Sequence, residues 1–464
     1  MQTANQMSPA RSGESLNPEE RVGSSLQAGT DTPQMNRSRK CESTPLNEFS
    51  NHEHAMMTIA EFKPTLDATS QTELSYFTNS LQNVQRWVEA ANYKGYEPFD
   101  GLSSPLRRMT FGNLFAQRVL QQIVRQSPLN LRPLLQIKPL DSTKGRGMMA
   151  LGYLLLFKST GDPDAKEKAI ACLDWLDEHK SPKFQKHSWA NYFDFASRGG
   201  IYYKDDSIIV WSSMIGQAYL EAFEQLQDER FLKIARSTCD WILSLPREKT
   251  TTGDCISYYA HGQESIHNAN MLGAAVLARA AKHTGNQEYL DVARSAITYS
   301  CSRMREDGSW WYAEEPKFRW IDNFHTGYNL DSLKCYIDCS GDATFKDHLR
   351  RGFEFFKHNF FESSGRPKYY HSRAYPIDIQ CASQAIDTLA YFAEEDRESL
   401  ALGAKVARWT IVNMQGPRGY FYYRRYPSGV TARTPMLHWG QATMFKALAH
   451  FILQLRNHEI RKTA

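Results

Sequence analysis

Long apolar runs are absent from this 464-residue sequence. No stretch approaches the roughly 18 consecutive apolar residues that a membrane-spanning helix needs. The polar N-terminus also lacks the apolar core of a secretory signal peptide. These absences argue against a membrane span and against secretion by the standard route, so we expect a cytoplasmic protein.

Paired cysteines are missing as well. The eight cysteines form no CxxC pair and no regular disulfide spacing, which predicts free thiols in a reducing compartment. Cys255, His261 and His267 are spaced C-x5-H-x5-H, and this spacing matches no standard zinc pattern. The sequence therefore predicts neither a bound metal nor another cofactor.

An excess of one charge is not visible either. The net charge is +4 over 55 basic and 51 acidic residues, and the two signs are interleaved along the chain. A protein that binds nucleic acid usually shows a basic patch or stripe. We therefore expect no nucleic-acid partner, although a small anionic ligand stays open.

Aromatic residues are scarce only near the N-terminus. Residues 1–70 are rich in Ser, Asn, Gln, Glu and Pro, and their only aromatic residues are Phe49 and Phe62. Such a segment has too little apolar surface to offset the loss of chain entropy on folding. We predict a disordered tail over residues 1–70 and one folded domain over residues 71–464.

The folded part contains an internal repeat. The segment MIGQAYLEAFEQLQDERFLKIARSTCDWIL from Met214 aligns with MLGAAVLARAAKHTGNQEYLDVARSAITYS from Met271, at a period near 58 residues. Each unit has an apolar helix, a short polar turn and an amphipathic helix. This pattern is typical of an antiparallel helix pair.

Six first helices of such pairs can be placed, beginning near Gly147, Ile208, Ser265, His325, Asp378 and Leu437. Five second helices begin near Pro163, Asp228, Asn286, Ala343 and Arg397. The sixth partner must come from the start of the fold, either from the helical segment at Leu74 or from residues 111–125. The sequence thus predicts an all-α (α/α)6 toroid, with small aromatic β-hairpins in the loops on one face.

The two ends of this ring are unequal. Turns between the paired helices have about four residues, whereas the return connections are long and contain the aromatic motifs SYY, SWWY, KYY and YFYY. Long connections in a compact domain are often functional. They lie at the N-termini of the inner helices, where unpaired N–H groups and the helix dipoles favour an anionic group on a ligand.

Polar side chains recur where each aromatic loop meets an inner helix, and in a toroid these clusters converge on one cavity. We predict Asp322 as general acid or base, His325 as the group that binds or shares its proton, and Asp194 or Asp378 as a second carboxylate. The predicted catalytic set is Asp322, His325, Asp378 and His438. The predicted substrate-binding set is Asp194, Arg198, Tyr258, His267, Asn268, Asn270, Trp311, Asn323, Tyr370, Tyr375, Gln380, Trp439 and Gln441.

Each of these residues has a structural alternative. Asp and Asn at a helix start are routine N-caps, so Asp322 and Asp378 could serve only that purpose. His325 could then be satisfied by a loop carbonyl. The aromatic pairs could form strands that cover the barrel, or they could face the cavity, where flat rings stack on sugar faces.

More specific motifs lie between Tyr93 and Phe451. They are YKGYEPFDGLSSPL, SIHNANMLGAAVLAR, DGSWWY, WIDNFHTGYNLDSLKCY, PKYYHSRAYPIDIQCASQAIDTL and HWGQATMFKALA. These segments resemble a bacterial and archaeal family of six-hairpin glycosidase-like proteins found with surface-polysaccharide synthesis genes, and the VpsJ proteins are similar. The resemblance implies a saccharide or glycan ligand and polysaccharide biosynthesis proteins as partners. Some relatives carry the name delta-aminolevulinic acid dehydratase, but nothing in this sequence supports that chemistry.

The resemblance also implies a wider superfamily of unsaturated glucuronyl hydrolases, polysaccharide lyases, glucuronyl epimerases and N-acylglucosamine 2-epimerases. In the epimerases, two histidines at the starts of late inner helices move a proton between the faces of a sugar. His325 and His438 occupy comparable sectors here. Those enzymes have a Glu one turn after the first histidine, where this chain has Tyr328 and Asn329, and this departure counts against epimerisation.

Three functions compete. The first is an enzyme of surface-polysaccharide metabolism that acts on an acidic or N-acetylated sugar by hydrolysis, elimination or epimerisation. The second is a non-catalytic glycan-binding or scaffold subunit of a polysaccharide biosynthesis machinery. The third, a terpenoid or peptide cyclase, needs an aspartate-rich motif or a Cys/His zinc site, and neither is evident in the sequence. We favour the enzyme.

Overall fold

A computed structural model describes the backbone of residues 66–463 and the side chains of residues 72–461. The tail predicted for residues 1–70 lies outside the described residues, except for residues 66–70, which belong to the first helix. None of the helices within the described range combines the length and the hydropathy needed to span a bilayer.

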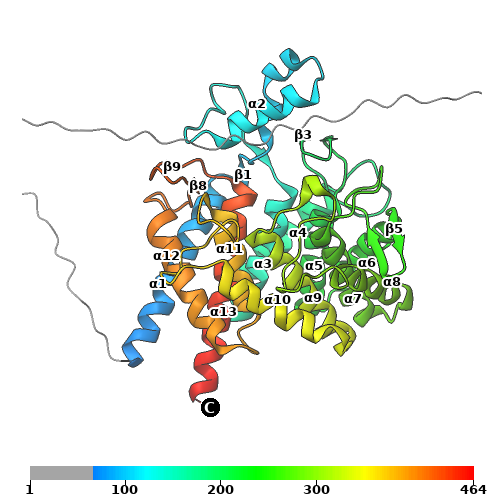
Figure 1. The fold of residues 1–464 in the computed structure, drawn as a ribbon. Helices are drawn as coiled ribbons and strands as arrows, with labels where there is room; N and C mark the ends of the chain where they lie inside the picture. The colour runs from blue at the N-terminus through cyan, green and yellow to red at the C-terminus, as the bar shows by residue number, and fades with distance from the viewer. Residues whose placement is uncertain (1–65, 464) are drawn as a thin grey trace, which may run out of the picture. The chain divides into compact units, whose positions relative to one another are not determined.

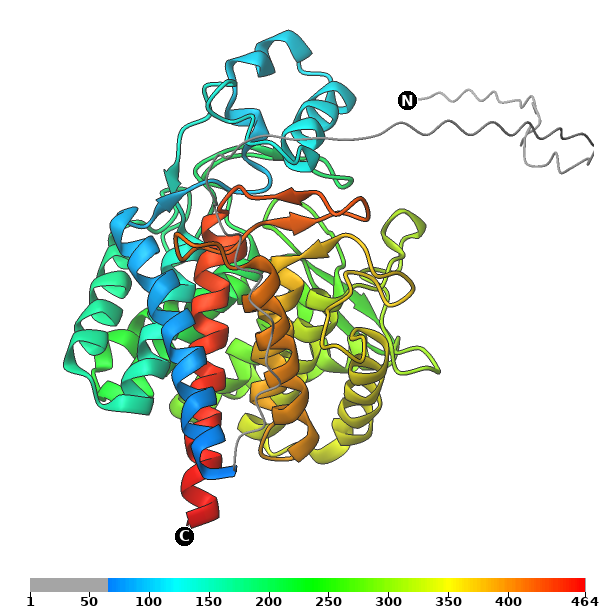
Figure 2. The same cartoon turned by 90° about the vertical axis from the view of Figure 1, so that its left-hand side faces the viewer.

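Within that range, six inner helices form a ring: α3 (Thr143–Thr160), α5 (Ile209–Leu226), α7 (His267–Thr284), α9 (Asn323–Ser340), α11 (Ile379–Tyr391) and α13 (Thr443–Thr463). Each packs on the next, and α13 packs on α3, so the ring closes. The outer helices are α4 (Pro163–Glu178), α6 (Glu229–Leu243), α8 (Gln287–Cys301), α10 (Lys346–Asn359), α12 (Arg397–Met414) and α1 (Leu66–Ala90). The predicted (α/α)6 toroid is confirmed (Figures 1 and 2).

The two rings differ in their burial as the sequence pattern requires. Inner helix α7 is buried without interruption from His267 to Ala278, because it contacts neighbours on every side. Outer helix α6 buries one stripe, which includes Phe231, Ala235 and Ile242, and turns its other face to solvent. Each large apolar side chain buried in this way contributes about 1.5–3 kcal/mol.

The ring is closed by the first of the two candidate segments. Helix α1 packs on α13, and the ring of Phe77 meets that of Phe451 at a centroid distance of 5.3 Å. The other candidate, α2 (Leu114–Gln126), packs on the 3-10 turns η1 (Asp100–Ser103) and η2 (Pro105–Thr110) and on strand β3 (Phe195–Ala196). It therefore forms part of a cap at the end of the barrel where the inner helices begin (Figures 1 and 2).

The short turns from inner to outer helices share one design. Four inner helices end at a residue with positive φ, whose N–H donates to a carbonyl of the last turn: Gly161, Gln227, Gly285 and Gly341. The next residue then caps the following helix with its side chain: Asp162, Asp228, Asn286 and Asp342. A left-handed C-cap followed by an Asp or Asn N-cap reverses the chain within a few residues.

The longer return connections contain short antiparallel strands, as the sequence predicts. Strand β1 (Lys94–Gly95) pairs with β2 (Leu140–Asp141), β3 pairs with β4 (Ile201–Tyr202), and β5 (Arg247–Thr250) pairs with β6 (Gly253–Ile256). Strands β7 (Ile377–Asp378), β8 (Arg424–Arg425) and β9 (Thr431–Ala432) form a three-stranded sheet. These hairpins cover the same end of the barrel as the α2 cap (Figure 2).

One hydrogen bond recurs at the starts of the inner helices. There, a backbone N–H donates to the carbonyl of a tyrosine in the return connection of the next sector. The pairs are Ile209 to Tyr258 (3.1 Å), His267 to Tyr312 (3.2 Å), Asn323 to Tyr369 (2.9 Å), Ile379 to Tyr423 (3.1 Å) and Leu437 to Tyr96 (2.9 Å). Because helix N-termini leave N–H groups unpaired, this bond satisfies one of them and fixes each connection over its neighbour.

The repeated turn predicts opposite effects at two equivalent positions. Gly285→Ala places a Cβ on a left-handed residue (φ 65°) and should lower the free energy of unfolding by about 1 kcal/mol. Gln227→Gly removes a Cβ from the equivalent left-handed residue (φ 56°) and should leave stability unchanged or raise it. Urea denaturation of both variants measures this. Equal losses in both would contradict the turn geometry.

Candidate functional site

A cavity of about 530 Å³ opens at the end of the barrel where the inner helices begin. Its wall combines the first turns of inner helices, the aromatic return connections and one side of α2. Eight of the predicted site residues line it: Arg198, Tyr258, Asn268, Asp322, His325, Tyr370, His438 and Trp439. The structure thus gathers residues from several sectors around one hollow.

Asp322 is both a helix cap and the partner of a histidine. Its Oδ1 accepts from the backbone N–H of His325 (3.0 Å), which caps α9. Its Oδ2 lies 2.7 Å from His325 Nδ1 and accepts from Trp320 Nε1 (2.8 Å). The carboxylate is 2% exposed, whereas His325 reaches the cavity. A carboxylate on Nδ1 fixes the tautomer of the imidazole and leaves Nε2 as its basic nitrogen.

His438 has a carboxylate partner that comes from a distant part of the chain. Glu97 accepts from the backbone N–H of His438 (3.2 Å) and lies 3.1 Å from His438 Nδ1. His438 belongs to a π-helical turn, η5 (Leu437–Ala442), that leads into α13. Burial, together with the nearby charge of Lys144, lowers the pKa of His438, so its imidazole is neutral at neutral pH.

Lys144 completes this group at the start of α3. Its ammonium lies 4.2 Å from the centroid of the Trp211 ring and lines the cavity. Burial lowers the pKa of Lys144 to about 8, against the opposing charge of Glu97. Burial alone would raise the pKa of Glu97, but His438 and Lys144 outweigh it and hold that pKa at about 2. A buried, ionised carboxylate therefore lies between a neutral imidazole and an ammonium that can lose its proton near pH 8.

Glu264 is a second acid on the wall. It is largely buried, and its carboxylate accepts a hydrogen bond from the hydroxyl of Tyr202. Burial raises the pKa of Glu264, while Tyr202 and Lys317 oppose the rise. The pKa values of Glu97 and Glu264 are thus shifted in opposite directions. Glu97 is held ionised, and Glu264 is made easier to protonate. Such separation is how one site keeps an acid and a base at the same pH.

Asn268 indicates where a polar ligand would bind. It lines the cavity, is 2% exposed, and its Oδ1 has no hydrogen-bond partner among the described residues. A buried amide oxygen without a partner is uncommon, because leaving it unpaired costs about 1–3 kcal/mol. A hydroxyl or amide N–H of a ligand would satisfy it.

Aromatic rings form the sides of the cavity. Tyr312 stacks on Trp320 at a centroid distance of 4.5 Å, and both flank His325. Phe324 contacts His325 (4.0 Å) and also Trp439 (5.3 Å), the neighbour of His438. The two histidines are therefore joined through a chain of contacting rings that faces one hollow. Flat apolar faces between polar groups suit a sugar ring.

The remaining predicted residues lie outside the lining, and all but Asn323 have structural partners for their side chains. Asp378 is fully buried, caps α11 and is ion-paired with Arg424. Asp194 is ion-paired with Arg107, and His267 lies 2.9 Å from Glu314. The others pack or bond within the walls: Asn270, Trp311, Tyr375, Gln380 and Gln441. Asn323 is fully buried, and neither of its side-chain polar atoms has a partner among the described residues.

Sequence reasoning missed several residues of this site: Glu264, Lys144, Arg118 and Arg125 line the cavity, and Glu97 binds His438 from outside the lining. Glu97 was inside the motif YKGYEPFDGLSSPL and Glu264 inside the loop before α7, but neither stood at a helix start. Lys144 did carry a signal, because a cation in the first turn of an apolar helix opposes the helix dipole. Arg118 and Arg125 line the cavity from α2, which the sequence offered only as a ring helix.

A metal site is not formed by the C-x5-H-x5-H segment. Cys255 is buried, His261 is exposed near Asp206, and His267 pairs with Glu314. Across the described residues, no three His, Cys, Asp or Glu side chains are placed to hold a metal ion.

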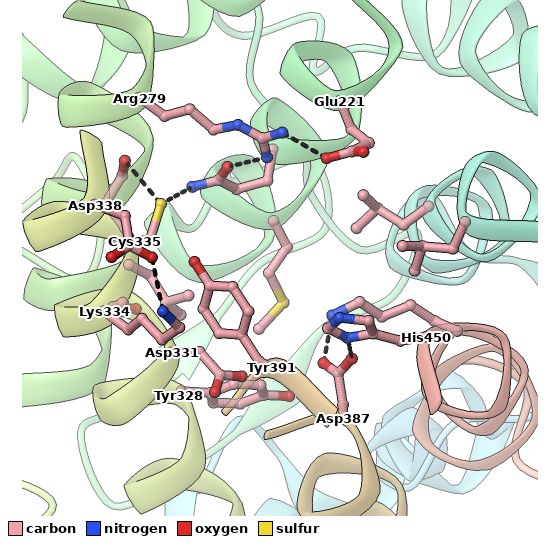
Figure 3. A pocket seen from close by; sticks show the side chains of 18 of the residues that line it. Glu221, Arg279, Tyr328, Asp331, Lys334, Cys335, Asp338, Asp387, Tyr391 and His450 are labelled. Carbon is pink, nitrogen blue, oxygen red and sulfur yellow. Dashed lines mark hydrogen bonds and ion pairs between the residues drawn. The ribbon is translucent and has the colours of Figure 1, made fainter. Parts of the chain in front are cut away.

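A second cavity of about 460 Å³ opens between the later turns of the inner helices. Met214 and Tyr328 line both cavities. Its charges are largely paired with one another: Arg279 with Glu221 and Glu224, Lys334 with Asp338, and Asp387 with Lys446 and His450 (Figure 3). Asp331 Oδ1 and Ser332 Oγ in this lining have no hydrogen-bond partner among the described residues. We place the candidate site in the first cavity because His325 and His438 both line it.

Asp331 of the second cavity forms no ion pair with another described residue. It accepts from Gln384 Nε2 (2.7 Å), and burial together with the charge of Asp387 raises its pKa to about 8. Burial would also raise the pKa of Asp387, but Lys446 and His450 hold it well below its usual range. At neutral pH the pair therefore keeps one proton.

The fold of this chain is shared with carbohydrate-active enzymes of the six-hairpin glycosidase-like kind. A cellobiose 2-epimerase from Bacillus thermoamylovorans matches with a TM-score of 0.60 and 9% identity, over 84% of this chain and 100% of that one. A polysaccharide lyase matches with a TM-score of 0.55 and 10% identity, over 85% and 99%. A GH76 α-mannanase from Bacteroides thetaiotaomicron matches with a TM-score of 0.52 and 13% identity, over 69% and 87%.

These identities establish a common fold and no more. No family model matches the sequence, and no curated protein matches it.

The contact of Glu97 with His438 predicts that the contribution of Glu97 to stability depends on pH. Because the folded pKa of about 2 lies below the ordinary value of 4.5, this carboxylate stabilises the fold above pH 4.5 and loses that effect as the pH falls toward 2. Glu97→Gln should lower the free energy of unfolding at neutral pH by on the order of 3 kcal/mol. Urea denaturation across the acid range should show the difference shrinking, with Glu167→Gln as the exposed control. A difference that does not change with pH would contradict the assignment.

Asp331, unlike Glu97, predicts a contribution to stability that falls as the pH rises. Its folded pKa of about 8 lies above its ordinary value of 3.8, so the native protein loses stability as the pH rises from about 4 to about 8. Asp331→Asn removes this loss, and the variant should gain on the order of 1 kcal/mol or more over the native chain across that range. Thermal unfolding at several pH values measures it. Parallel curves for the two proteins would refute the raised pKa.

Proposed function

We propose that this protein is an enzyme of surface-polysaccharide metabolism that moves a proton on an acidic or N-acetylated sugar. One observation carries the proposal. Two imidazoles, each backed by a carboxylate, face one aromatic-lined cavity from different sectors of the ring: His325 with Asp322, and His438 with Glu97.

We infer the class of ligand from the charged groups of the cavity and from its polar atom that has no hydrogen-bond partner. Arg118, Arg125, Arg198 and Lys144 line it, and the positive ends of the inner-helix dipoles point toward it. A carboxylate on the ligand would be bound by these groups. Asn268 Oδ1 would accept from a hydroxyl or an acetamido N–H, and the rings of Trp320 and Tyr312 would hold the apolar face of the sugar.

Proton transfer at carbon is the reaction that this arrangement supports best. His325 Nε2 would take a proton from the ring carbon beside a carbonyl or carboxyl group, because Asp322 stabilises the imidazolium that forms. The negative charge that develops on the sugar would be stabilised by Lys144 or an arginine. Return of a proton from the other face, by protonated Glu264 or by the imidazolium form of His438, gives an epimer. Loss of a leaving group from the next carbon gives an unsaturated sugar.

Hydrolysis is less well supported. It needs one carboxyl group as acid and another as nucleophile or base. Asp322 is engaged by His325 and by Trp320, which leaves Glu264 as the remaining carboxyl group in the lining. The neighbours in fold include an epimerase, a lyase and a mannanase, so the choice of proton transfer rests on the residues of the cavity.

The proposal is tested by incubating the protein with uronic-acid and N-acetylhexosamine oligosaccharides in deuterated water. Uptake of one deuterium without change of chain length indicates epimerisation, and a shorter chain with an unsaturated end indicates elimination. His325→Gln and His438→Gln should each lower turnover by about 10²–10⁴-fold, the usual contribution of a positioned acid or base. Binding of the sugar should change far less.

His261→Gln is the matched control, because His261 lies in a loop at the same rim but outside the cavity lining. It should keep full turnover. Equilibrium binding of a saccharide with no product and no deuterium uptake would contradict the proposal, and would favour a glycan-binding or scaffold subunit instead.

A further inference from the structure

The cap at the end of the barrel has an unusual composition. Residues 101–140 contain no Asp or Glu and six cationic residues: Arg107, Arg108, Arg118, Arg125, Arg132 and Lys138. The chain as a whole has almost equal numbers of acidic and basic residues. Arg107 and Arg132 are paired with acids from outside this segment, whereas Arg108 and Lys138 are exposed.

The same segment carries most of the large apolar side chains that the described residues expose to solvent. Phe111 is 94% exposed and Phe115 is 74% exposed. Seven further apolar residues of this segment are exposed: Leu106, Met109, Leu114, Val119, Ile123, Leu129 and Leu134. Clusters of this kind on a protein surface mark a binding face, because isolated apolar residues are common but gathered ones are not. We call these residues the cap patch.

Helix α2 shows why the patch is exposed. Two of its glutamines face the protein: Gln117 is buried, and the Gln121 side chain exchanges two hydrogen bonds with the backbone of Ala196 (2.7 and 2.8 Å). The apolar side of the helix, with Phe115, Val119 and Ile123 at a spacing of four residues, therefore points outward. The orientation is set by these polar contacts, and it leaves the hydrophobic stripe without a partner among the described residues.

The occupant must suit a projecting, cationic and apolar surface. Figures 1 and 2 show α2 and its flanking turns standing out from the end of the barrel, so the segment that carries the patch projects from the domain. A second copy of the chain would bring Arg108 and Lys138 against the same cations. An interface between water and anionic lipid accepts both features, because apolar side chains enter the acyl boundary while arginine and lysine remain at the headgroups.

We propose that the cap patch docks this protein on the surface of a bilayer that contains anionic lipids. The apolar side chains of η2 and α2 enter the interface, and Arg108 and Lys138 bind lipid headgroups. Docking does not depend on the proposed reaction. It has a consequence for the cavity, because Arg118, Gln122 and Arg125 of the same helix line its wall. A docked protein would hold that wall close to glycans displayed at the membrane surface.

The test is co-sedimentation of the full chain with lipid vesicles. The protein should bind vesicles of phosphatidylcholine with phosphatidylglycerol at least tenfold more strongly than vesicles of phosphatidylcholine alone, and added salt should weaken binding. The double variant Phe111→Ser, Phe115→Ser should lower binding at least tenfold, and so should Arg108→Glu with Lys138→Glu. Val412→Ser with Val430→Ser is the matched control, because both valines are exposed elsewhere.

All the substituted side chains are exposed, so circular dichroism and thermal melting should match the native chain. Three results would overturn the proposal: no sedimentation of the native chain with anionic vesicles, equal binding by the native chain and the Phe111/Phe115 variant, or a stable dimer that this variant converts to monomer. The last result would assign the patch to a second copy. None of these results depends on turnover, so they leave the proposed reaction to its own test.

Discussion

The structure depends on a hydrogen bond that repeats around one rim of the toroid. At five of the six inner helices, a backbone N–H at the start of the helix donates to a tyrosine carbonyl in the next sector, and the bond from Leu437 to Tyr96 joins the last sector to the first. Helix N-termini buried in a barrel need such partners. The bond also fixes the aromatic connections over the ring, so the side chains beside it are held at defined positions. Asp322 and His325, next to the Asn323 to Tyr369 bond, belong to this rim.

The charged groups at the two ends of the barrel interior differ in how completely they are paired. At the rim with the tyrosine bonds, Glu97 holds His438 and lies near Lys144, whose pKa of about 8 allows it to gain or lose a proton. The polar groups there also leave Asn268 Oδ1 without a partner in the described protein. In the second cavity Arg279 is ion-paired with Glu221 and Glu224, and Asp387 with Lys446 and His450. Figure 3 shows the pairs of Arg279 with Glu221 and of Asp387 with His450. Paired charges hold the inner helices together, whereas incompletely paired ones can bind a ligand.

The fold could be predicted from the sequence because a repeat near 58 residues, with its Gly-Asp and Gly-Asn turns, specifies helix pairs by local chemistry alone. The junction of loop and inner helix could likewise be recognised, which is why the sequence places Asp322, His325 and His438 at the rim, where they line the cavity; their catalytic roles stay a prediction. Glu97 could not be, because its role depends on a contact with His438 across 341 residues of sequence. Asp378 looked equivalent to Asp322, but Arg424 pairs with it in the buried wall. The sequence of α2 suggested a ring helix, since its amphipathic pattern does not say which face turns inward; Gln121 and Ala196 decide that.

The central claim is that the rim cavity between His325 and His438 binds a sugar. A crystal structure of the protein with a uronic-acid disaccharide tests it most directly. The account predicts a sugar ring against Trp320 and Tyr312, a ring carbon within reach of His325 Nε2, and a ligand donor on Asn268 Oδ1. A disaccharide bound instead in the second cavity, beside Arg279 and Asp387, would contradict the account, and so would a rim cavity left empty at saturating ligand.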